Sequence, residues 1–361
     1  MGLLDSFKGV ISGSVLGVDV GTTGIKIVEL SRGKQQVRLS NYGLVESTAH
    51  LLRANKVLQT STLKIYEDAA AEMLKELVGR MKPSTRDVVA SIPPFTSFIT
   101  TVDLPKMEEK DLAAAMQYQV KQYVPLPMEE VAIDWLRVAA YEDEKGYYHQ
   151  QVLLVVVPQE QIRRFQSLFK LAGLNLKALE VESFGLLRSL IAGDATPTMI
   201  LDIGSRASSI TLTDQGQIRY VAQTDYAGSS LTQAVASSLN INPIRAEELK
   251  RQRGVLASGP SMELSTVMLP ILDVILGEAG KTEYNYQTQF PNSRKAERII
   301  LTGGTANLLG IERYIEQQMQ IPVIKASPLL RLEYQPLLEP FLQELNPILS
   351  VAVGVALRQF S

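Results

Sequence analysis

The chain has 361 residues, enough for two domains with buried cores, and its 45% hydrophobic and 20% charged content is ordinary for a globular protein. A net charge of −2 argues against a general nucleic-acid-binding surface, which needs clustered positive charge. There is no cysteine, which excludes disulfides, thiolate nucleophiles and cysteine-based metal sites. The two histidines, His50 and His149, lie in no recognisable metal-binding motif.

The beginning of the chain does not have the pattern of a signal peptide, because a basic start and a long apolar stretch are both missing. Five apolar residues fall on one helical face there, which predicts a short segment that packs on the body: Leu3, Leu4, Phe7, Val10 and Ile11. Its short length and Gly9 argue against a membrane anchor. No apolar run approaches the roughly 20 residues that span a bilayer. We therefore expect a cytoplasmic protein that reaches a membrane only through a partner.

The first half of the chain opens with a predicted strand–turn–strand hairpin at 15–30 and a further strand at 36–46. A helix is predicted at 66–81, where apolar residues recur at helical spacing before a proline. Residues 84–177 then follow a β-α-β-β-α pattern. This change predicts a compact subdomain inserted into a first domain of residues 1–197.

The second half is predicted to form a second domain at residues 198–361. Helices are expected at 230–239, at 243–253 and through 265–289, and a strand at 298–302 leads through a glycine pair into another helix. The proline- and leucine-rich region 327–347 is expected to be irregular. A last helix at 347–358 is expected to return towards the region between the domains.

The hairpin at the start of the first half has an echo in the second half. Residues 16–30 and 200–212 both run apolar strand, aspartate, apolar residue, glycine, small polar loop, apolar strand, which places Asp19 and Asp202 at equivalent positions. A repeat of this long period predicts two related halves. It also predicts a site between them, faced by one glycine turn and one carboxylate from each half.

The first of these turns has the residues to bind a metal–phosphate complex. Tight turning, backbone N–H groups and hydroxyl donors come from Gly21, Thr22, Thr23 and Gly24. Lys26 adds an ammonium on the return strand, while Asp19 would repel bare phosphate, so the loop implies a divalent cation such as Mg²⁺. A plain hairpin with Asp19 capping the turn explains one such copy equally well. Two copies favour the metal–phosphate interpretation.

Other phosphate-binding motifs do not fit. The first loop lacks the Gly-x-Gly-x-x-Gly spacing of dinucleotide-binding folds and enters a strand rather than a helix. Gly280-Lys-Thr282 resembles the end of a P-loop, but Ile275 stands where its first glycine is needed. A third glycine element does fit, because Gly303 and Gly304 follow a buried strand and precede a helix. They leave room for a base, a sugar or an α-phosphate at the helix N-terminus.

In this order the three loops resemble those of the actin-like ATPase superfamily. The resemblance implies a duplicated, actin-like (ribonuclease H-like) α/β fold that binds ATP and Mg²⁺ between its two domains. Asp19 and Asp202 would hold the hydrated metal, and Lys26 would contact the β-phosphate. Further nucleotide contacts are implied for residues 21–24 of the first loop and for Gly204, Ser205, Arg206, Gly228, Gly303, Gly304 and Asn307.

The same resemblance implies roles for three side chains outside the loops. Ala246-Glu-Glu-Leu-Lys250 is similar to a superfamily segment in which an acid and a lysine, here Glu247 and Lys250, touch the ribose and base. An ordinary charged helix face explains that segment as well. Glu182 and Asp202 would be the catalytic residues, with Glu182 near the attacking water, although an acid at a helix start has a structural explanation too.

The inserted subdomain is similar to the arrangement of the FtsA branch of the superfamily. Four segments resemble the PilM family of type IV pilus assembly proteins: Ser91–Pro93, Val102–Met107, Lys121–Trp135 and Val351–Arg358. This implies a cytoplasmic ATP-binding scaffold and switch, peripheral to the inner membrane. Its partner would be the N-terminal tail of a PilN-like inner-membrane protein, with other components of the pilus inner-membrane complex. Nucleic acid is not an expected partner, and self-assembly into a homo-oligomer is a further expectation.

Two alternatives remain at this point. A small-molecule kinase on the same fold would need a sugar-sized pocket and a general base. A cell-division filament protein of the FtsA type usually ends in an amphipathic membrane helix, whereas residues 347–358 are apolar with little basic character. The second loop, Gly204-Ser-Arg-Ala-Ser208, is poorer in glycine than actin or chaperone loops. It favours nucleotide binding with at most slow ATPase activity.

Overall fold

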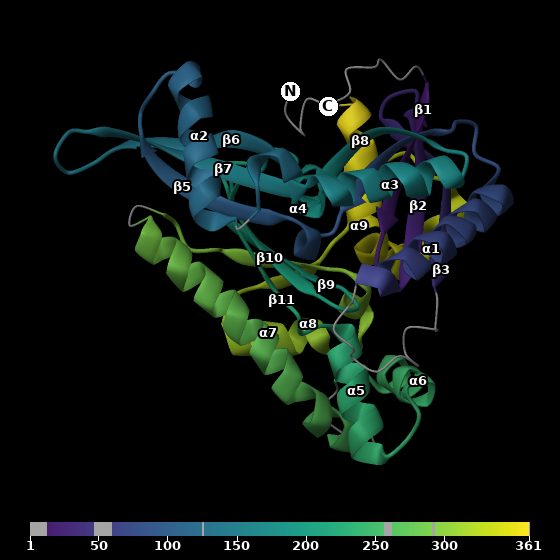
Figure 1. Cartoon of the computed structure of the whole chain (residues 1–361). Helices are drawn as coiled ribbons and strands as arrows, with labels where there is room; N and C mark the ends of the chain where they lie inside the picture. Colours follow the sequence, from purple (N-terminus) through teal and green to yellow (C-terminus); the bar gives the residue numbers. More distant parts are fainter. Residues whose placement is uncertain (1–12, 47–59, 125, 256–261, 291–292, 361) are drawn as a thin grey trace.

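The computed structural model describes residues 13–46, 60–124, 126–255, 262–290 and 293–360. The apolar segment predicted at residues 3–11 lies outside this range. The described chain contains two five-stranded sheets and one three-stranded sheet. Figure 1 shows the chain coloured from its start to its end.

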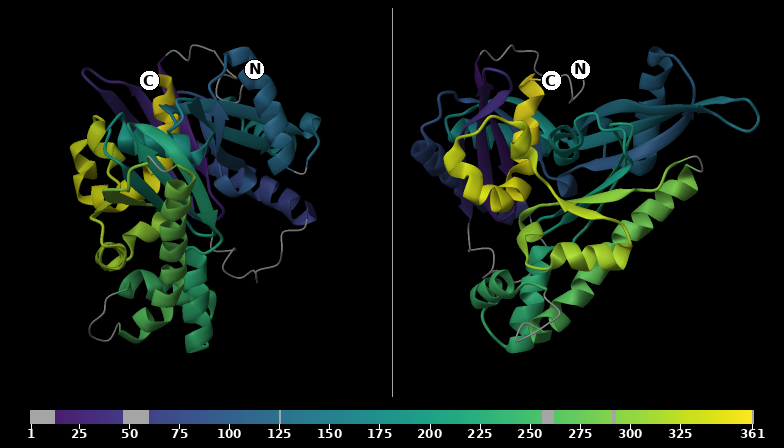
Figure 2. Two further views of the ribbon diagram at one scale, coloured as in Figure 1. Left: turned by 90° about the vertical axis from the view of Figure 1, so that its left-hand side faces the viewer. Right: turned by 180° about the vertical axis from the view of Figure 1, so that it is seen from behind.

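The first sheet has the strand order β3-β2-β1-β4-β8. It consists of β1 (Ser14–Val20), β2 (Gly24–Arg32), β3 (Val37–Glu46), β4 (Asp87–Ile92) and β8 (Asn175–Val181). The first three strands are antiparallel, while β4 and β8 run parallel to β1. Helices α1 (Thr60–Met81) and α3 (Gln159–Leu171) cover one face, and α9 (Leu342–Leu357) covers the other (Figures 1 and 2).

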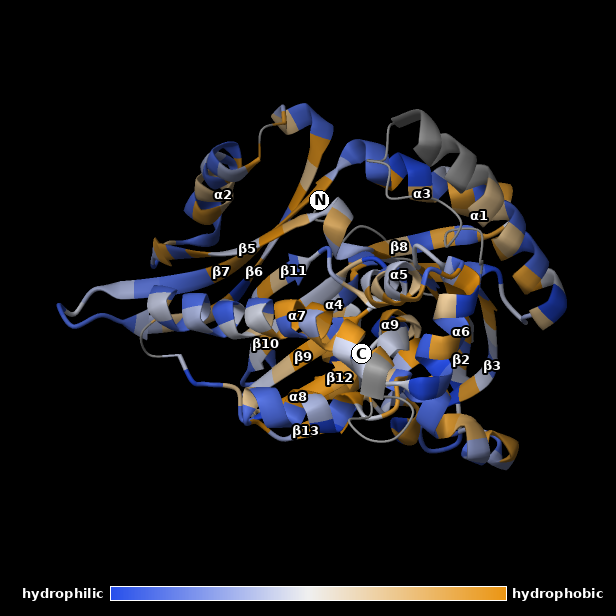
Figure 3. Cartoon of the chain, turned by 90° about the horizontal axis from the view of Figure 1, so that it is seen from below, coloured by the Kyte–Doolittle hydropathy of each residue, from blue (hydrophilic) through white to orange (hydrophobic). Residues whose placement is uncertain are grey.

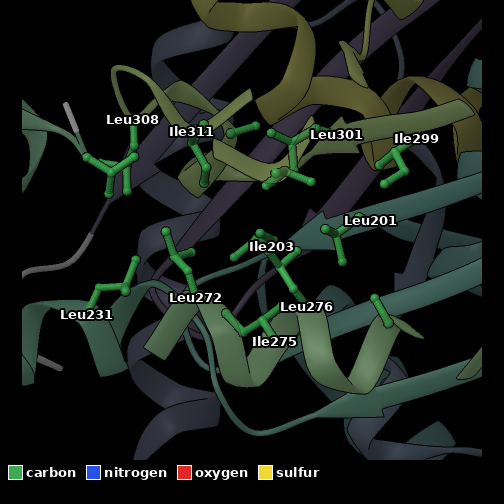
Figure 4. Close-up of a cluster of buried hydrophobic side chains, with 14 of the residues drawn as sticks. Leu201, Ile203, Leu231, Leu272, Ile275, Leu276, Ile299, Leu301, Leu308 and Ile311 are labelled. Atoms are coloured by element: carbon green, nitrogen blue, oxygen red, sulfur yellow. The ribbon is translucent and has the colours of Figure 1, made fainter. Parts of the chain in front are cut away.

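The second sheet repeats this plan with the order β11-β10-β9-β12-β13. Its strands are β9 (Thr198–Ile203), β10 (Ser208–Asp214), β11 (Gln217–Thr224), β12 (Arg298–Thr302) and β13 (Val323–Lys325). Its outer face buries an apolar core beneath α5 (Gly228–Leu239), α6 (Pro243–Arg253), α7 (Met262–Gln289) and α8 (Ile311–Met319) (Figure 4). The β9–β10 hairpin occupies the place that β1–β2 has in the first sheet, as the sequence repeat predicts.

The third sheet, with the order β5-β7-β6, belongs to the insertion. It comprises β5 (Phe98–Pro105), β6 (Val131–Glu142) and β7 (Tyr148–Pro158), with α2 (Glu109–Tyr123) on one face. The apolar run 152–157 in β7 is buried on both faces, because alternate residues face α2 and the body of the protein. The boundaries predicted for the insertion, residues 84 and 177, stay a prediction. The third sheet uses only 98–158, since β4 and β8 pair within the first sheet.

The insertion also touches the second half of the chain. Thr101 on β5 donates its hydroxyl proton to the carbonyl oxygen of Arg219 on β11 at 2.6 Å. Gln289, at the end of α7, donates to the carbonyl oxygen of Thr101 at 3.1 Å. The third sheet therefore rests on both halves. Its hairpin tip is hydrophilic and projects away from the apolar strands β9 and β12 (Figure 3).

Helices α4 (Glu182–Leu186) and α9 lie between the two large sheets, where their side chains form a shared apolar core. The contact depends on small residues. A Cβ on Gly354 would lie 1.9 Å from the carbonyl oxygen of Gly185, and one on Gly17 would lie 2.0 Å from that of Ala352. Helix α9 is thus packed against α4 and β1 at backbone distance.

The prediction that the last helix begins at residue 347 is wrong. Helix α9 begins at Leu342 and contains Pro347, because Leu342 and Leu345 are buried in the shared core and this burial outweighs the helix-breaking tendency of proline. The backbone is also held there, since Thr302 Oγ1 and the Gly303 N–H both donate to the carbonyl oxygen of Pro347.

The window 336–360, which includes α9, is the single stretch of the described chain that is long and apolar enough to cross a membrane by length and composition. Within this stretch, 67% of the most apolar 18-residue window is buried inside the protein, so its apolar character is explained by packing in the core. The shorter elements are π-helix Leu187–Ile191 and the 3₁₀ turns Pro94–Thr96, Met128–Glu130, Gly304–Asn307, Pro328–Arg331, Pro336–Phe341 and Arg358–Phe360.

Candidate functional site

The site begins at the end of β1, where a carboxylate and an ammonium face each other. Strand register pairs Asp19 with Lys26 on β2, and the Lys26 ammonium lies 2.8 Å from Asp19 Oδ2. Ser91, at the end of the neighbouring strand β4, donates its hydroxyl proton to Asp19 Oδ1 at 3.1 Å. These contacts hold the Asp19 carboxylate in one orientation. They also supply polar partners for a carboxylate that is largely shielded from water, since only 5% of the residue is exposed.

The carboxylates of Glu182 and Asp202 also interact electrostatically with the Lys26 ammonium. Burial and the nearby carboxylates of Asp19 and Asp202 raise the pKa of Glu182 well above its ordinary value. Burial and Asp19 raise the pKa of Asp202 to about 6, although Lys26 opposes the shift. Burial also disfavours the Lys26 ammonium, but attraction to Asp19, Glu182 and Asp202 outweighs it and raises the pKa of Lys26.

The cluster therefore combines three carboxyl groups with one ammonium in a poorly hydrated place. Such an excess of carboxylates is what a divalent cation would relieve. Within the described residues, no group of three or more histidine, aspartate or glutamate side chains is arranged to hold a metal ion directly. The residues fit a cation held by Asp19 and Asp202 through water, which is the way Mg²⁺ is usually bound.

The first predicted loop forms a tight turn between β1 and β2. The Gly21 N–H donates to the carbonyl oxygen of Gly24 at 2.9 Å, so it closes the turn. A side chain on Gly24 would lie 2.5 Å from the carbonyl oxygen of Val45, which explains the glycine there by packing. The predicted phosphate-binding role of residues 21–24 stays a prediction.

The second predicted loop is tied to the start of α5. The carbonyl oxygen of Gly204 accepts from the Gly228 N–H at 3.0 Å and from Thr305 Oγ1 at 3.1 Å. The carbonyl oxygen of Ser205 accepts from the Ser229 N–H at 2.7 Å. A Cβ on Gly228 would lie only 2.6 Å from Thr305 Oγ1, so the three segments meet closely. Arg206 lies in the same turn and is half-buried.

The third predicted loop meets Asp202 itself. Gly303 has a φ of +86°, and a Cβ there would lie 2.3 Å from Asp202 Oδ1. The place of a Cβ on Gly304, in contrast, is open, as a cradle for a ligand requires. Asn307 lies in the 3₁₀ turn of this loop. Its side-chain amide donates a hydrogen bond of 2.9 Å to the carbonyl oxygen of Glu344 on α9. Its role towards a nucleotide stays a prediction.

Helix α6 brings Glu247 and Lys250 beside the start of α5, where all three donors of the Lys250 ammonium have protein partners, and their predicted contacts with a ribose and base stay a prediction. Its ammonium, 5% exposed as a residue, contacts the Gly228 carbonyl oxygen at 2.9 Å, Thr232 Oγ1 at 2.8 Å and Glu247 at 2.7 Å. Three donors have three partners. Burial lowers the pKa of Lys250, whereas attraction to Lys250 outweighs burial and lowers the pKa of Glu247 to about 2.

An ion pair that the sequence analysis missed crosses from one half of the chain to the other. Arg251 on α6 lies 3.0 Å from Glu46 at the end of β3, and its Nε donates to Glu247 at 2.8 Å. Ser91 was missed as well. Its position beside Asp19 identifies it as a site residue. That position cannot be read from the sequence, because it depends on β4 lying next to β1 in the sheet.

Comparison with known proteins places this geometry in a family. A family model described as type IV pilus assembly protein PilM matches residues 17–360. A solved PilM–PilN type IV pilus biogenesis complex contains a similar chain, with 23% identity and a TM-score of 0.80 over 98% of this chain and 100% of that chain. MreB 5 of Spiroplasma citri bound to AMPPNP is similar at 13% identity and a TM-score of 0.54, covering 95% of each chain.

The ethanolamine utilization protein EutJ from Carboxydothermus hydrogenoformans gives a TM-score of 0.57 at 16% identity, over 97% of this chain and 92% of that one. These likenesses confirm the actin-like, two-domain α/β fold. The match over residues 17–360 gives no support to a cell-division protein or a small-molecule kinase. It shows that the chain belongs to the PilM family of actin-like type IV pilus assembly proteins.

Proposed function

We propose that this protein is an ATP-binding scaffold and switch of type IV pilus assembly, which binds the cytoplasmic tail of a PilN-like inner-membrane protein. The observation that carries the nucleotide part is the buried cluster of Asp19, Glu182 and Asp202 around Lys26. Its two aspartates end equivalent strands of the two sheets, β1 and β9.

The residues fit a metal–triphosphate complex. Asp19 and Asp202 would hold the hydrated Mg²⁺, which when bound would neutralise charge on the phosphate oxygens. Lys26 would contact the β-phosphate, and residues 22–24 and 204–206 would offer N–H groups and hydroxyls. Glu182, at the first turn of α4, would orient a water molecule. The similar fold of MreB 5 with bound AMPPNP supports this assignment.

The adenosine side of the site would be formed by the start of α5, by α6 and by the third loop. Gly228, Gly303 and Gly304 would leave space for the sugar and base. Because the three donors of Lys250 are occupied, its role would be to hold α6 and α5 together behind the nucleotide. Glu247 would then form the polar edge of this wall.

The partner site would lie on the inserted subdomain. Aromatic and apolar side chains remain exposed on α2 and just after it: Tyr118 at 65%, Tyr123 at 45% and Leu126 at 38%. Such a surface suits a short peptide segment. The similar chain in the PilM–PilN complex supports a PilN-like tail as that peptide. Binding would hold the protein at the cytoplasmic face of the inner membrane, where other pilus components and further copies of the chain could assemble.

The nucleotide part is tested by calorimetry with ATP in the presence and absence of Mg²⁺. Asp19→Ala and Asp202→Ala should each weaken Mg²⁺–ATP binding at least tenfold, about 1.4 kcal/mol. Glu144→Ala, an exposed acid in the β6–β7 turn, is the control and should bind as the wild type does. Unchanged affinity in both aspartate variants, with their folding intact, would remove the metal assignment.

The partner part is tested by titrating a PilN-like tail peptide into the intact protein. A Tyr118→Ser, Leu126→Ser variant should bind the peptide more weakly, whereas Tyr284→Ser, similarly exposed on α7, should not. Repeating both titrations with Mg²⁺–ATP measures the switch, for which coupling of about 1–3 kcal/mol is expected. Equal peptide affinity in all variants excludes the subdomain, and equal affinity with and without ATP excludes the coupling.

A further inference from the structure

One ammonium joins the two parts of the proposed nucleotide site, the metal-binding carboxylates and the phosphate loop. The Lys26 Nζ atom lies 2.8 Å from Asp19 Oδ2. The same atom lies against the turn between β1 and β2, since a Cβ on Gly21 would be 3.2 Å from it. Lys26 therefore contacts both the carboxylate that is proposed to hold the metal ion and the loop that is proposed to hold the phosphates.

The Asp19 carboxylate is already engaged by the chain itself. Its other oxygen, Oδ1, accepts the hydroxyl proton of Ser91 at 3.1 Å. Both oxygens thus have a donor from the protein, and the residue is only 5% exposed, so water can add few further partners. A divalent cation that reached Asp19 would have to share a carboxylate whose charge is balanced by Lys26.

Lys26 also balances the other two acids of the site. Its charge favours the ionised forms of Glu182 and Asp202, against the burial that raises the pKa of both. The ammonium and a divalent cation would therefore compete for the same carboxylates and repel each other in a place that screens charges poorly. A triphosphate at the turn would change this balance, because its negative oxygens attract the ammonium away from Asp19.

We propose that Lys26 is an internal countercation, which keeps divalent metal ions off Asp19 until a phosphate group binds at the turn and draws the ammonium towards itself. Metal ion and triphosphate would then bind together, and each would bind poorly alone. This inference rests on the proposed Mg²⁺–ATP site and adds the order in which that site is filled. An ion pair that only joined β1 to β2 would have no such effect on metal binding.

The test is a titration of the full chain with Mn²⁺ in the absence of nucleotide, followed by electron paramagnetic resonance. Mn²⁺ serves as the probe because it suits the same carboxylate and water ligands as Mg²⁺. The wild type and Lys26→Arg, which keep the positive charge, should bind Mn²⁺ weakly. Lys26→Met should bind it roughly tenfold more tightly or better, because the three carboxylates then have no internal cation. Lys145→Met, at an exposed position of the β6–β7 turn, is the matched control and should bind as the wild type does.

A second substitution locates the gained binding. Asp19→Asn in the Lys26→Met background should abolish the gain, because the carboxylate that Lys26 covers is then absent. Circular dichroism checks the folding of each variant, and Lys26→Gln is measured in parallel so that the result does not depend on one variant. The inference is overturned if Lys26→Met and Lys26→Gln bind Mn²⁺ no more tightly than the wild type, or if the gain persists with Asp19→Asn.

Calorimetry of the wild type with Mg²⁺–ATP keeps this result distinct from that of the proposed function. Binding of Mg²⁺–ATP by the wild type without any gain of Mn²⁺ affinity in Lys26→Met would overturn the inference and leave the proposed function standing. A gain of Mn²⁺ affinity without Mg²⁺–ATP binding by the wild type would refute the proposed nucleotide function, and with it the phosphate-dependent part of the inference.

Discussion

Asp202, only 9% exposed at the end of β9, would have to be charged to hold a metal ion, in a place that disfavours its charge. Burial and Asp19 raise its pKa to about 6 from the ordinary 3.8. In the folded protein the carboxyl group therefore keeps its proton up to a higher pH than in the unfolded chain. Its contribution favours folding at low pH and is lost as the pH rises through about 6, so charged Asp202 lowers the stability of the free protein.

Asp202→Asn should for this reason stabilise the free protein while it removes metal binding. At about pH 8 we expect its free energy of unfolding to exceed that of the wild type by about 1–3 kcal/mol, and the difference to shrink as the pH falls towards 4. Denaturant titrations without nucleotide or metal at both pH values measure this. Asp225→Asn, at an exposed position, is the control. A gain that does not depend on pH would contradict the explanation.

At the scale of elements, helix α6 joins the two halves of the chain through Arg251. Both Arg251 and Glu46 have side chains that are 59% exposed, so their ion pair contributes little to folding. Its place at the junction of the halves means that it can still oppose their separation. If the halves close around a nucleotide as proposed, the pair would favour that arrangement more than it favours the fold itself.

Arg251→Gln should accelerate nucleotide dissociation by roughly two- to fivefold, the range that an exposed ion pair allows, with a change in unfolding free energy below about 0.5 kcal/mol. Stopped-flow release of a fluorescent ATP analogue measures the rate. Arg245→Gln is a matched control on the same helix, because Arg245 pairs only with Glu248 at 2.8 Å among the described acids. Equal release rates in the two variants would show that the pair across the halves has no part in retention.

The close contact between α9 and α4 can be tested by substituting the glycines on which it depends. Gly354→Ala should lower the free energy of unfolding by about 2–4 kcal/mol, because its Cβ would overlap the backbone of Gly185 and the two helices would have to separate. Gly277→Ala, in α7, is the control, since its Cβ would meet nothing within 4 Å. That variant should be as stable as the wild type or gain about 0.5–1 kcal/mol. Similar losses in both would contradict the packing explanation.

At the scale of the whole molecule, the two related halves could be predicted from the sequence. The repeat around Asp19 and Asp202 consists of local strand and turn patterns, which do not depend on contacts between distant segments. The last helix was predicted to begin too late, because Pro347 is locally unfavourable and only its tertiary burial shows why α9 includes it. Contacts between distant segments were out of reach. The Arg251–Glu46 pair and the full engagement of Lys250 depend on how helices from one half meet strands and loops of both.

The whole site leads us to expect slow ATP hydrolysis. The loop 204–208 is committed to contacts with α5 and the third loop, and the pKa of Glu182 is raised well above that of an ordinary carboxylate, which favours the protonated form. Turnover of the isolated protein should fall well below the usual enzyme range of about 1–10³ s⁻¹. Phosphate release measured with the wild type and Asp202→Asn decides this, and a wild-type rate within that range would refute it.

The seating of α9 on β1 has a consequence for synthesis of the protein. Gly17 leaves the ribosome long before Ala352, against which it packs, and at usual translation rates the interval is roughly 20–60 s. During this time one apolar face of the first sheet has no cover, so the nascent chain needs either rapid completion or a holding chaperone. Chains arrested before residue 342 should bind such chaperones and be digested by protease, whereas chains extended past 357 and free of the ribosome should resist it.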